Sequence, residues 1–144
     1  MDKPVVEVET SIAADAKTIW KLMTAKRSAM FPGSTVETDW RPGHSLTLRG
    51  EWQGKSFTDY GEIESADEGR ELSFTHWSKT PERPDSYHLV RYRLEPDGKK
   101  TKVSLAQFNK GKDTAVDAKT KAEFEKNWTM MLDGQKQAAE GKGN

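Results

Sequence analysis

The side chains best suited to chemistry are one carboxylate and two imidazoles, Asp59, His76 and His88, all within predicted strands. An imidazole can accept or donate a proton near neutral pH, and a neighbouring carboxylate favours its charged form. Two histidines and an aspartate could also bind zinc, but no short motif supports such a site, and we expect no metal. Two further interpretations stay open. Asp59 and His76 could form a pair with a purely structural role, and His88 could lie at the rim of the sheet in contact with solvent.

Hairpin turns decide which of these side chains share a face of the sheet. Three dipeptides ending in glycine separate runs of alternating apolar and polar residues and predict two-residue loops, at Gln53-Gly54, Glu68-Gly69 and Asp97-Gly98. The first two loops put Asp59 opposite Leu48 and Gly61 opposite His76. Asp59 and His76 then become diagonal neighbours, with about 7 to 8 Å between their backbones. Gly61, which has no side chain, would leave room between them.

The third loop extends this inward face to the last two strands. It sets Tyr92 opposite Val103, Val90 opposite Leu105 and His88 opposite Gln107. An unpaired buried polar group costs about 1 to 3 kcal/mol, so the polar residues on this face need a partner, a water or a ligand. An apolar cavity with a few convergent polar groups is the usual form of a small-molecule site. The residues predicted to bind a ligand are Leu48, Trp52, Phe57, Asp59, Phe74, His76, His88, Tyr92, Gln107, Trp128 and Met131.

The elements that must position these residues follow from hydrophobic periodicity. Alternation over Val6–Ile12 predicts a strand, and apolar residues at helical spacing after Ala14 predict a short helix, followed by a second over Ala25–Phe31. A long helix should begin near Ala118 and carry Trp128 inward. Six more strands are predicted at Thr35–Trp40, Ser45–Trp52, Ser56–Glu64, Glu71–Trp77, Tyr87–Leu94 and Lys102–Phe108. The order predicts one α+β domain over residues 1–144, a curved antiparallel sheet of about seven strands around the last helix, with residues 1–4 and 141–144 flexible.

Composition narrows the classes of partner. The chain has 23 basic and 23 acidic residues, so its net charge of zero favours neither nucleic acid nor an anionic membrane. It has no cysteine, no signal peptide and no apolar segment long enough to span a membrane, and we expect a soluble cytoplasmic protein. Phosphate-binding loops, metalloprotease motifs and nucleophile elbows are missing from the sequence, so we expect no cofactor and assign no catalytic residue.

The chain also resembles a known family. The resemblance is carried by Val6–Ala14, Trp20, Trp40–Gly43, Gly61–Glu64, Leu72–Phe74, Leu94–Thr101 and Trp128–Leu132. Over nearly its whole length the sequence resembles the START-like, helix-grip superfamily, and within it the heat-shock-protein ATPase activator homologue branch, often grouped with polyketide cyclases. The resemblance implies a shared fold and cavity, but no common set of catalytic residues. One position departs from the branch, because His76 stands where an aromatic residue, often tryptophan, is common.

These observations predict a protein that binds a hydrophobic or aromatic small molecule between the sheet and the last helix, as a monomer or weak homodimer. One alternative is an enzyme of the cyclase or dehydratase type, in which His76 or Asp59 moves a proton in the same cavity. The other is a regulator of a chaperone ATPase, which the branch name suggests.

Overall fold

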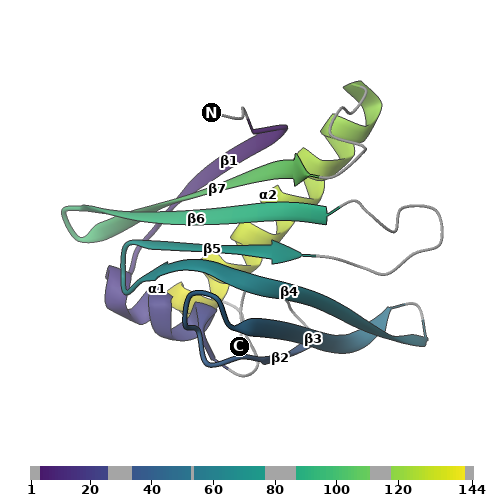
Figure 1. The fold of residues 1–144 in the computed structure, drawn as a ribbon. Coiled ribbons are helices and arrows are strands. Elements are labelled where there is room, and N and C mark those ends of the chain that lie inside the picture. Colours follow the sequence, from purple (N-terminus) through teal and green to yellow (C-terminus); the bar gives the residue numbers. More distant parts are fainter. Residues whose placement is uncertain (1–3, 26–33, 53, 77–86, 111–117, 142–144) are drawn as a thin grey trace.

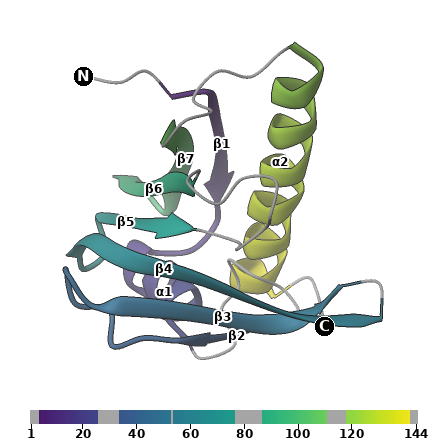
Figure 2. The ribbon, with the colours of Figure 1, turned by 45° about the vertical axis from the view of Figure 1, so that its right-hand side comes forward.

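The computed structural model describes residues 4–25, 34–52, 54–76, 87–110 and 118–141. Seven strands form one antiparallel sheet in the order β1-β7-β6-β5-β4-β3-β2. The elements are β1 (Val6–Ile12), α1 (Ala16–Met23), β2 (Ser34–Glu37), β3 (Ser45–Trp52), β4 (Lys55–Asp67), β5 (Glu71–His76), β6 (Tyr87–Asp97), β7 (Lys100–Lys110) and α2 (Ala118–Glu140). The sheet curves around α2, which crosses its concave face (Figures 1 and 2), and this confirms the predicted helix-grip fold. The second short helix predicted over Ala25–Phe31 lies, apart from its first residue, outside the described residues.

The residue types of β1 and α1 explain where these two elements lie and which of their side chains are buried. The alternation of β1 places Val6 and Ile12 in the core and its glutamates in solvent. Asp15 then caps α1 by accepting a hydrogen bond from the backbone N–H of Thr18 at 2.7 Å. The buried face of α1 carries Ile19, Trp20 and Met23 at helical spacing. Within the described residues, no helix has the length and apolar character needed to cross a membrane.

The core lies between the concave face of the sheet and α2. Its hydrophobic sheet residues with 0% exposure are Ile12, Ile63, Leu72, Phe74, Val90, Tyr92, Val103 and Leu105, and α2 adds Leu132 at 2%. One polar pair interrupts this apolar layer, because the Gln135 side-chain amide donates a hydrogen bond to the Tyr92 hydroxyl at 3.1 Å. Burial raises the pKa of Tyr92 well above that of a free tyrosine, since the charged phenolate would lose its hydration there.

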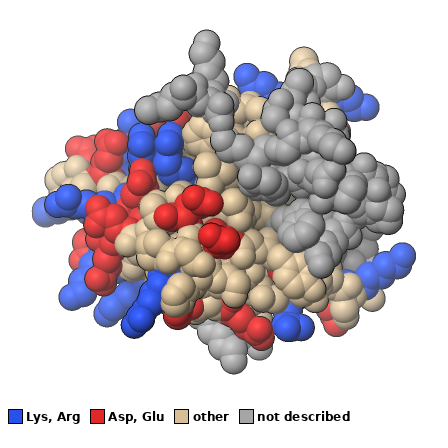
Figure 3. All heavy atoms as spheres, viewed as in Figure 1, with Lys and Arg blue, Asp and Glu red and all other residues tan. Residues whose placement is uncertain are grey.

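The outer surface mixes charges of both signs. On the face shown in Figure 3, acidic and basic side chains are interspersed over the described residues, and they form no large patch of one sign. Ion pairs of this exposed kind join Arg93 to Glu71 at 2.8 Å and Lys102 to Glu9 at 3.2 Å. Such pairs contribute little to stability because water screens them.

The first hairpin has the predicted pairing, and the second returns to the predicted register through a longer loop and a register shift. The pairing of Leu48 with Asp59 is confirmed. Beyond the second turn, Asp67 pairs with Glu71, so the loop has three residues rather than two. A register shift between Ile63 and Ser65 then pairs Ile63 with Phe74, which is the register that the prediction of Gly61 opposite His76 implies. A three-residue loop with a glycine in the left-handed region is a common hairpin alternative, and Gly69 has φ +78°.

The register predicted for the third hairpin is wrong by two residues. Asp97 pairs with Lys100, so the turn comprises Gly98 and Lys99 rather than Asp97 and Gly98. Gly98 has φ +64°, and glycine accepts this left-handed conformation at the first turn position without strain. The observed partners are Leu105 for Tyr92, Gln107 for Val90 and Asn109 for His88. Because side chains alternate with a period of two, a shift of two residues leaves each on its predicted face.

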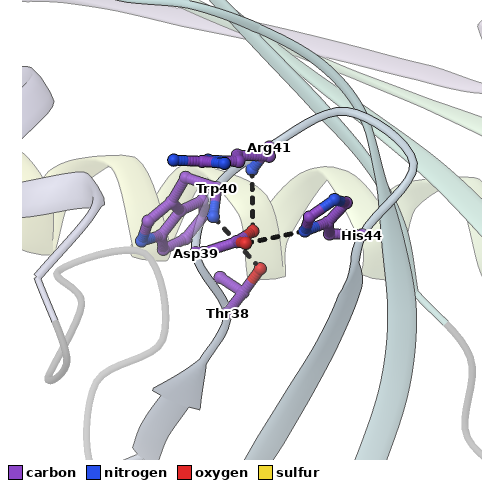
Figure 4. A network of polar contacts seen from close by, with 5 residues as sticks. All are labelled: Thr38, Asp39, Trp40, Arg41 and His44. Atoms are coloured by element: carbon purple, nitrogen blue, oxygen red, sulfur yellow. Dashed lines mark hydrogen bonds and ion pairs between the residues drawn. The ribbon is translucent and has the colours of Figure 1, made fainter.

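Strand β2 is shorter than predicted, because a polar turn redirects the chain before Trp40. The strand ends at Glu37, and Trp40 has φ +60°, which is rare for a bulky residue. The Asp39 carboxylate accepts hydrogen bonds from the Arg41 backbone N–H at 3.1 Å and from His44 Nδ1 at 2.6 Å (Figure 4). These local bonds offer the backbone an alternative to the sheet ladder and explain why the strand stops.

Two glycines give opposite expectations for the same substitution. A Cβ at Gly61 would clash with the Thr75 carbonyl oxygen, whereas a Cβ at Gly134 in α2 would meet no atom within 4 Å. We therefore expect Gly61→Ala to lower the free energy of unfolding by about 1 to 3 kcal/mol or more. Gly134→Ala should raise it by about 0.5 to 1 kcal/mol, because alanine is the better helix former. Urea unfolding curves measure both, and a shift in the same direction would contradict this close approach of β4 and β5.

The buried Tyr92 hydroxyl predicts a loss of stability at alkaline pH. The folded protein keeps this proton, while the unfolded chain loses it above about pH 10, so the unfolded state binds fewer protons and becomes favoured as pH rises. The stabilisation is complete below that pH. In urea unfolding between about pH 8 and 11, Tyr92→Phe should flatten the alkaline decline. Tyr60→Phe, at a residue 39% exposed, is the control and should keep the decline.

Candidate functional site

A pocket of about 310 Å³ lies between the concave face of the sheet and α2. Its lining residues come from both layers: Ser34, Leu48, Glu51, Phe57, Asp59, His76, His88, Gln107, Phe124, Asn127, Trp128 and Met131. Eight of the eleven residues predicted to bind a ligand are among them. Phe74 and Tyr92 are both 0% exposed and belong to the core instead, and the side chain of Trp52 lies outside the described residues.

The predicted contact between Asp59 and His76 is confirmed. His76 Nε2 lies 2.8 Å from Asp59 Oδ2, and the two side chains are 22% and 14% exposed. An ionised carboxylate only accepts hydrogen bonds, so His76 Nε2 carries the hydrogen. Strands β4 and β5 bring the pair together beside Gly61, where the backbones approach too closely for a side chain. The site therefore holds an imidazole whose orientation is set by a carboxylate.

A second polar network links the sheet to α2. The Trp128 indole N–H donates to Gln107 Oε1, and this fixes the amide of a side chain that is only 1% exposed. Gln107 Nε2 then donates to Asn109 Oδ1 at 2.8 Å. His88 Nδ1 lies 2.9 Å from that oxygen and 3.0 Å from Gln107 Nε2, so it completes the cluster. The predicted polar residues thus pair with protein groups.

Aromatic contacts join the two networks. The rings of His76 and His88 stack, with centroids 6.2 Å apart and an angle of 17° between their planes. Phe124 meets His88 edge to face at a centroid distance of 5.8 Å. This brings the first half of α2 against the ends of β5 and β6. His88 is half-buried, and its ring lines the pocket next to Phe124.

Several residues of the site were not predicted from the sequence. Ser34, Glu51, Phe124 and Asn127 line the pocket, and Asn109 completes the polar cluster. A signal exists for two of them: Asn109 follows Gln107 by two residues on the same face of β7, and Phe124 precedes Trp128 by one helical turn. His44, by contrast, lies outside this pocket, bonded to Asp39 in the turn after β2. In the described part of the chain, His, Cys, Asp and Glu side chains form no group of three that could hold a metal ion.

Comparison with known proteins gives one family and one shared fold. The family model described as Activator of Hsp90 ATPase homolog 1-like protein matches residues 13–140. A solution structure of a protein from Cytophaga hutchinsonii has a TM-score of 0.76 and 31% identity, over 95% of this chain and 94% of that one. The comparison with curated proteins produced no match.

Two more distant structures share the fold alone. The Aha1 dimer from Colwellia psychrerythraea has a TM-score of 0.72 at 13% identity, over 96% of this chain and 98% of that one. DynU16, a protein of the dynemicin biosynthetic locus, has a TM-score of 0.70 at 15% identity, over 92% of this chain but only 45% of its own.

The indole hydrogen bond of Trp128 can be separated from the packing of its ring. Trp128→Phe keeps a ring but leaves the buried Gln107 carbonyl oxygen without its donor, so we expect a loss of about 1 to 3 kcal/mol. Trp128→Ala also removes the ring, and its cost should be larger, but below the roughly 3 to 5 kcal/mol of a fully buried tryptophan because this one borders a pocket. Urea unfolding measures both, and a loss below about 0.5 kcal/mol for Trp128→Ala would contradict its inward position.

Proposed function

Because the chain belongs to the family of Activator of Hsp90 ATPase homolog 1-like proteins, we propose that it binds a small hydrophobic or aromatic molecule between the sheet and α2. The observation that carries the proposal is the pocket of about 310 Å³, where apolar and aromatic side chains surround the Asp59–His76 pair. Small-molecule sites commonly have about 300 to 1,000 Å³ and a few well-placed polar groups, and this pocket is at the small end of that range.

Two forces would act on such a ligand. Burial of its apolar surface against residues such as Phe57, Trp128 and Met131 contributes about 25 cal/mol for each Å² removed from water, before the entropy of association is subtracted. The polar groups of Asp59 and His76 orient one end of the molecule. The lack of cysteine suits a reducing compartment, so we place this activity in the cytoplasm.

The contact between Asp59 and His76 also favours a second candidate, an enzyme of the cyclase or dehydratase type. A carboxylate that holds one nitrogen of a histidine stabilises the charged ring that forms when the other nitrogen takes a proton. His76 would then move a proton of the bound substrate. The fold shared with DynU16, whose gene lies in a biosynthetic locus, is compatible with this candidate.

The remaining alternatives concern protein partners. Among the described residues, only Tyr60 and Met130 are large hydrophobic side chains with substantial exposure, so we rank regulation of a chaperone ATPase behind small-molecule binding. The Colwellia psychrerythraea structure is a dimer, but at 13% identity this says nothing of assembly here. A monomer or weak homodimer stays a prediction.

Native mass spectrometry of the protein isolated from its source organism tests the proposal. We expect an added mass that is present under native conditions and lost on denaturation. His76→Phe should keep the fold but weaken retention of a ligand with a polar end, and it should abolish turnover if the pair transfers protons. His44→Phe, at a histidine outside the pocket, is the matched control and should behave as the parent protein. Equal retention by both variants would contradict the role given to His76.

A further inference from the structure

We infer that Thr75 is a positioning residue for the Asp59–His76 pair, and that it acts from the opposite face of the sheet. This role goes beyond the proposed function and does not depend on it, because it concerns how the imidazole of the pocket is held rather than what binds there. Two features of the sheet support it. The backbone pairing of β4 with β5 ends before the pair, and a side chain bridges the two strands at that point.

The backbone ladder between β4 and β5 stops short of the pair. In the described strands its last partners are Ile63 and Phe74, whereas Asp59 and His76 lie further along. Each of these two residues is paired on its other side, Asp59 with β3 and His76 with β6. The backbone pairing therefore fixes each residue relative to an outer neighbour, and it does not fix the distance between the two.

The side chain of Thr75 bridges β4 and β5 where their ladder has ended. The backbone N–H of Glu62 donates to the Thr75 hydroxyl oxygen at 2.9 Å, and that oxygen lies 3.5 Å from the Glu62 carbonyl oxygen. In a regular antiparallel ladder a backbone carbonyl accepts from such an N–H. The Thr75 carbonyl oxygen lies against Gly61, where a Cβ would clash with it. A hydroxyl thus serves as the acceptor at a position where a backbone carbonyl is usual.

Thr75 acts on the pocket through the backbone. Successive side chains of a strand point to opposite faces, so the Thr75 side chain lies on the convex side while His76 lines the pocket. The hydroxyl holds Glu62, which follows Asp59 by three residues on β4, against the residue that precedes the imidazole. A hydrogen bond of 2.8 Å weakens beyond about 3.2 Å, so a shift of β4 against β5 by about 0.5 Å is enough to weaken the contact of His76 with Asp59.

Thr75→Val separates the hydroxyl from the shape of the side chain, because valine is also branched at Cβ but accepts no hydrogen bond. We expect the variant to fold, which circular dichroism checks, but to open the hydrogen bond between Asp59 and His76 more often. The hydrogen on His76 Nε2 should then exchange with water at least about tenfold faster than in the parent protein, as followed by NMR. Thr75→Ser restores the hydroxyl and should return the exchange rate to within about threefold of the parent value.

Ser73→Ala is the matched control. Ser73 lies two residues before Thr75 on the same face of β5, and its hydroxyl contacts that of Ser65 on β4. Ser65 and Ser73 are partners within the ladder, so backbone pairing holds the two strands together there. Ser73→Ala should lower the free energy of unfolding but leave the exchange at His76 unchanged. A merely structural role of Thr75 would give the same result for Thr75→Val.

Unchanged exchange in Thr75→Val would overturn the inference. Equal acceleration in Ser73→Ala would also overturn it, because it would indicate a general loosening of the sheet. Thr75→Ala, which lacks the hydroxyl as well, replaces Thr75→Val if that variant does not fold.

Crystal structures of the parent and the variant decide the question if the Nε2 hydrogen exchanges too fast to be observed. A distance from His76 Nε2 to Asp59 Oδ2 beyond about 3.2 Å in the variant supports the inference, and an unchanged distance of 2.8 Å overturns it. Neither measurement involves a ligand, so a failure here leaves the proposed function standing, and the absence of a bound ligand leaves the role of Thr75 standing.

Discussion

The packing of one helix against a curved sheet determines where the pocket of this protein lies. Towards its C-terminal end, α2 buries Leu132 and Gln135 against the core, and this end of the concave face is filled. Nearer its N-terminal end, the helix places half-buried Phe124, Trp128 and Met131 over the sheet, and the pocket lies beneath them. A single straight helix cannot fill the whole of a concave surface, and Figure 2 shows how α2 crosses it. The pocket is thus a consequence of the same packing that stabilises the fold.

The packing of α2 on the sheet also determines whether the buried polar groups of the pocket have hydrogen-bond partners. Gln107 is 1% exposed, and an amide in such a position would be strongly unfavourable without partners. Trp128 supplies a donor from α2, and Asn109 supplies an acceptor from the same strand. The network therefore depends on the docked helix and, in return, specifies how deeply the helix packs. A polar network of this kind keeps a pocket in one shape and favours one orientation of a bound molecule.

Asp59 and His76 illustrate how one geometry serves more than one function. Their hydrogen bond joins β4 to β5 and orients an imidazole that lines the pocket, an arrangement compatible with ligand binding and with proton transfer. Binding proteins and enzymes of one fold can differ only in whether the bound molecule presents a reactive proton to such a group. The fold and family membership leave this choice to the ligand.

Hydrophobic periodicity and turn chemistry in the sequence determined the element order, the inward faces and the contact between Asp59 and His76, because these depend on neighbours along the chain and across one turn. The predicted hairpin loops were wrong where more than one turn geometry suits the same residues. In the third hairpin the turn lies one residue further along the chain than predicted. In the second hairpin the loop is one residue longer than predicted, and a register shift between Ile63 and Ser65 compensates for it. Only the tertiary structure decided that Phe74 and Tyr92 belong to the core while Phe124 and Asn127 line the pocket. The reason is physical: all four lie on elements that the sequence predicts, but their depth depends on where the helix crosses the sheet, and no pattern within either element encodes that position.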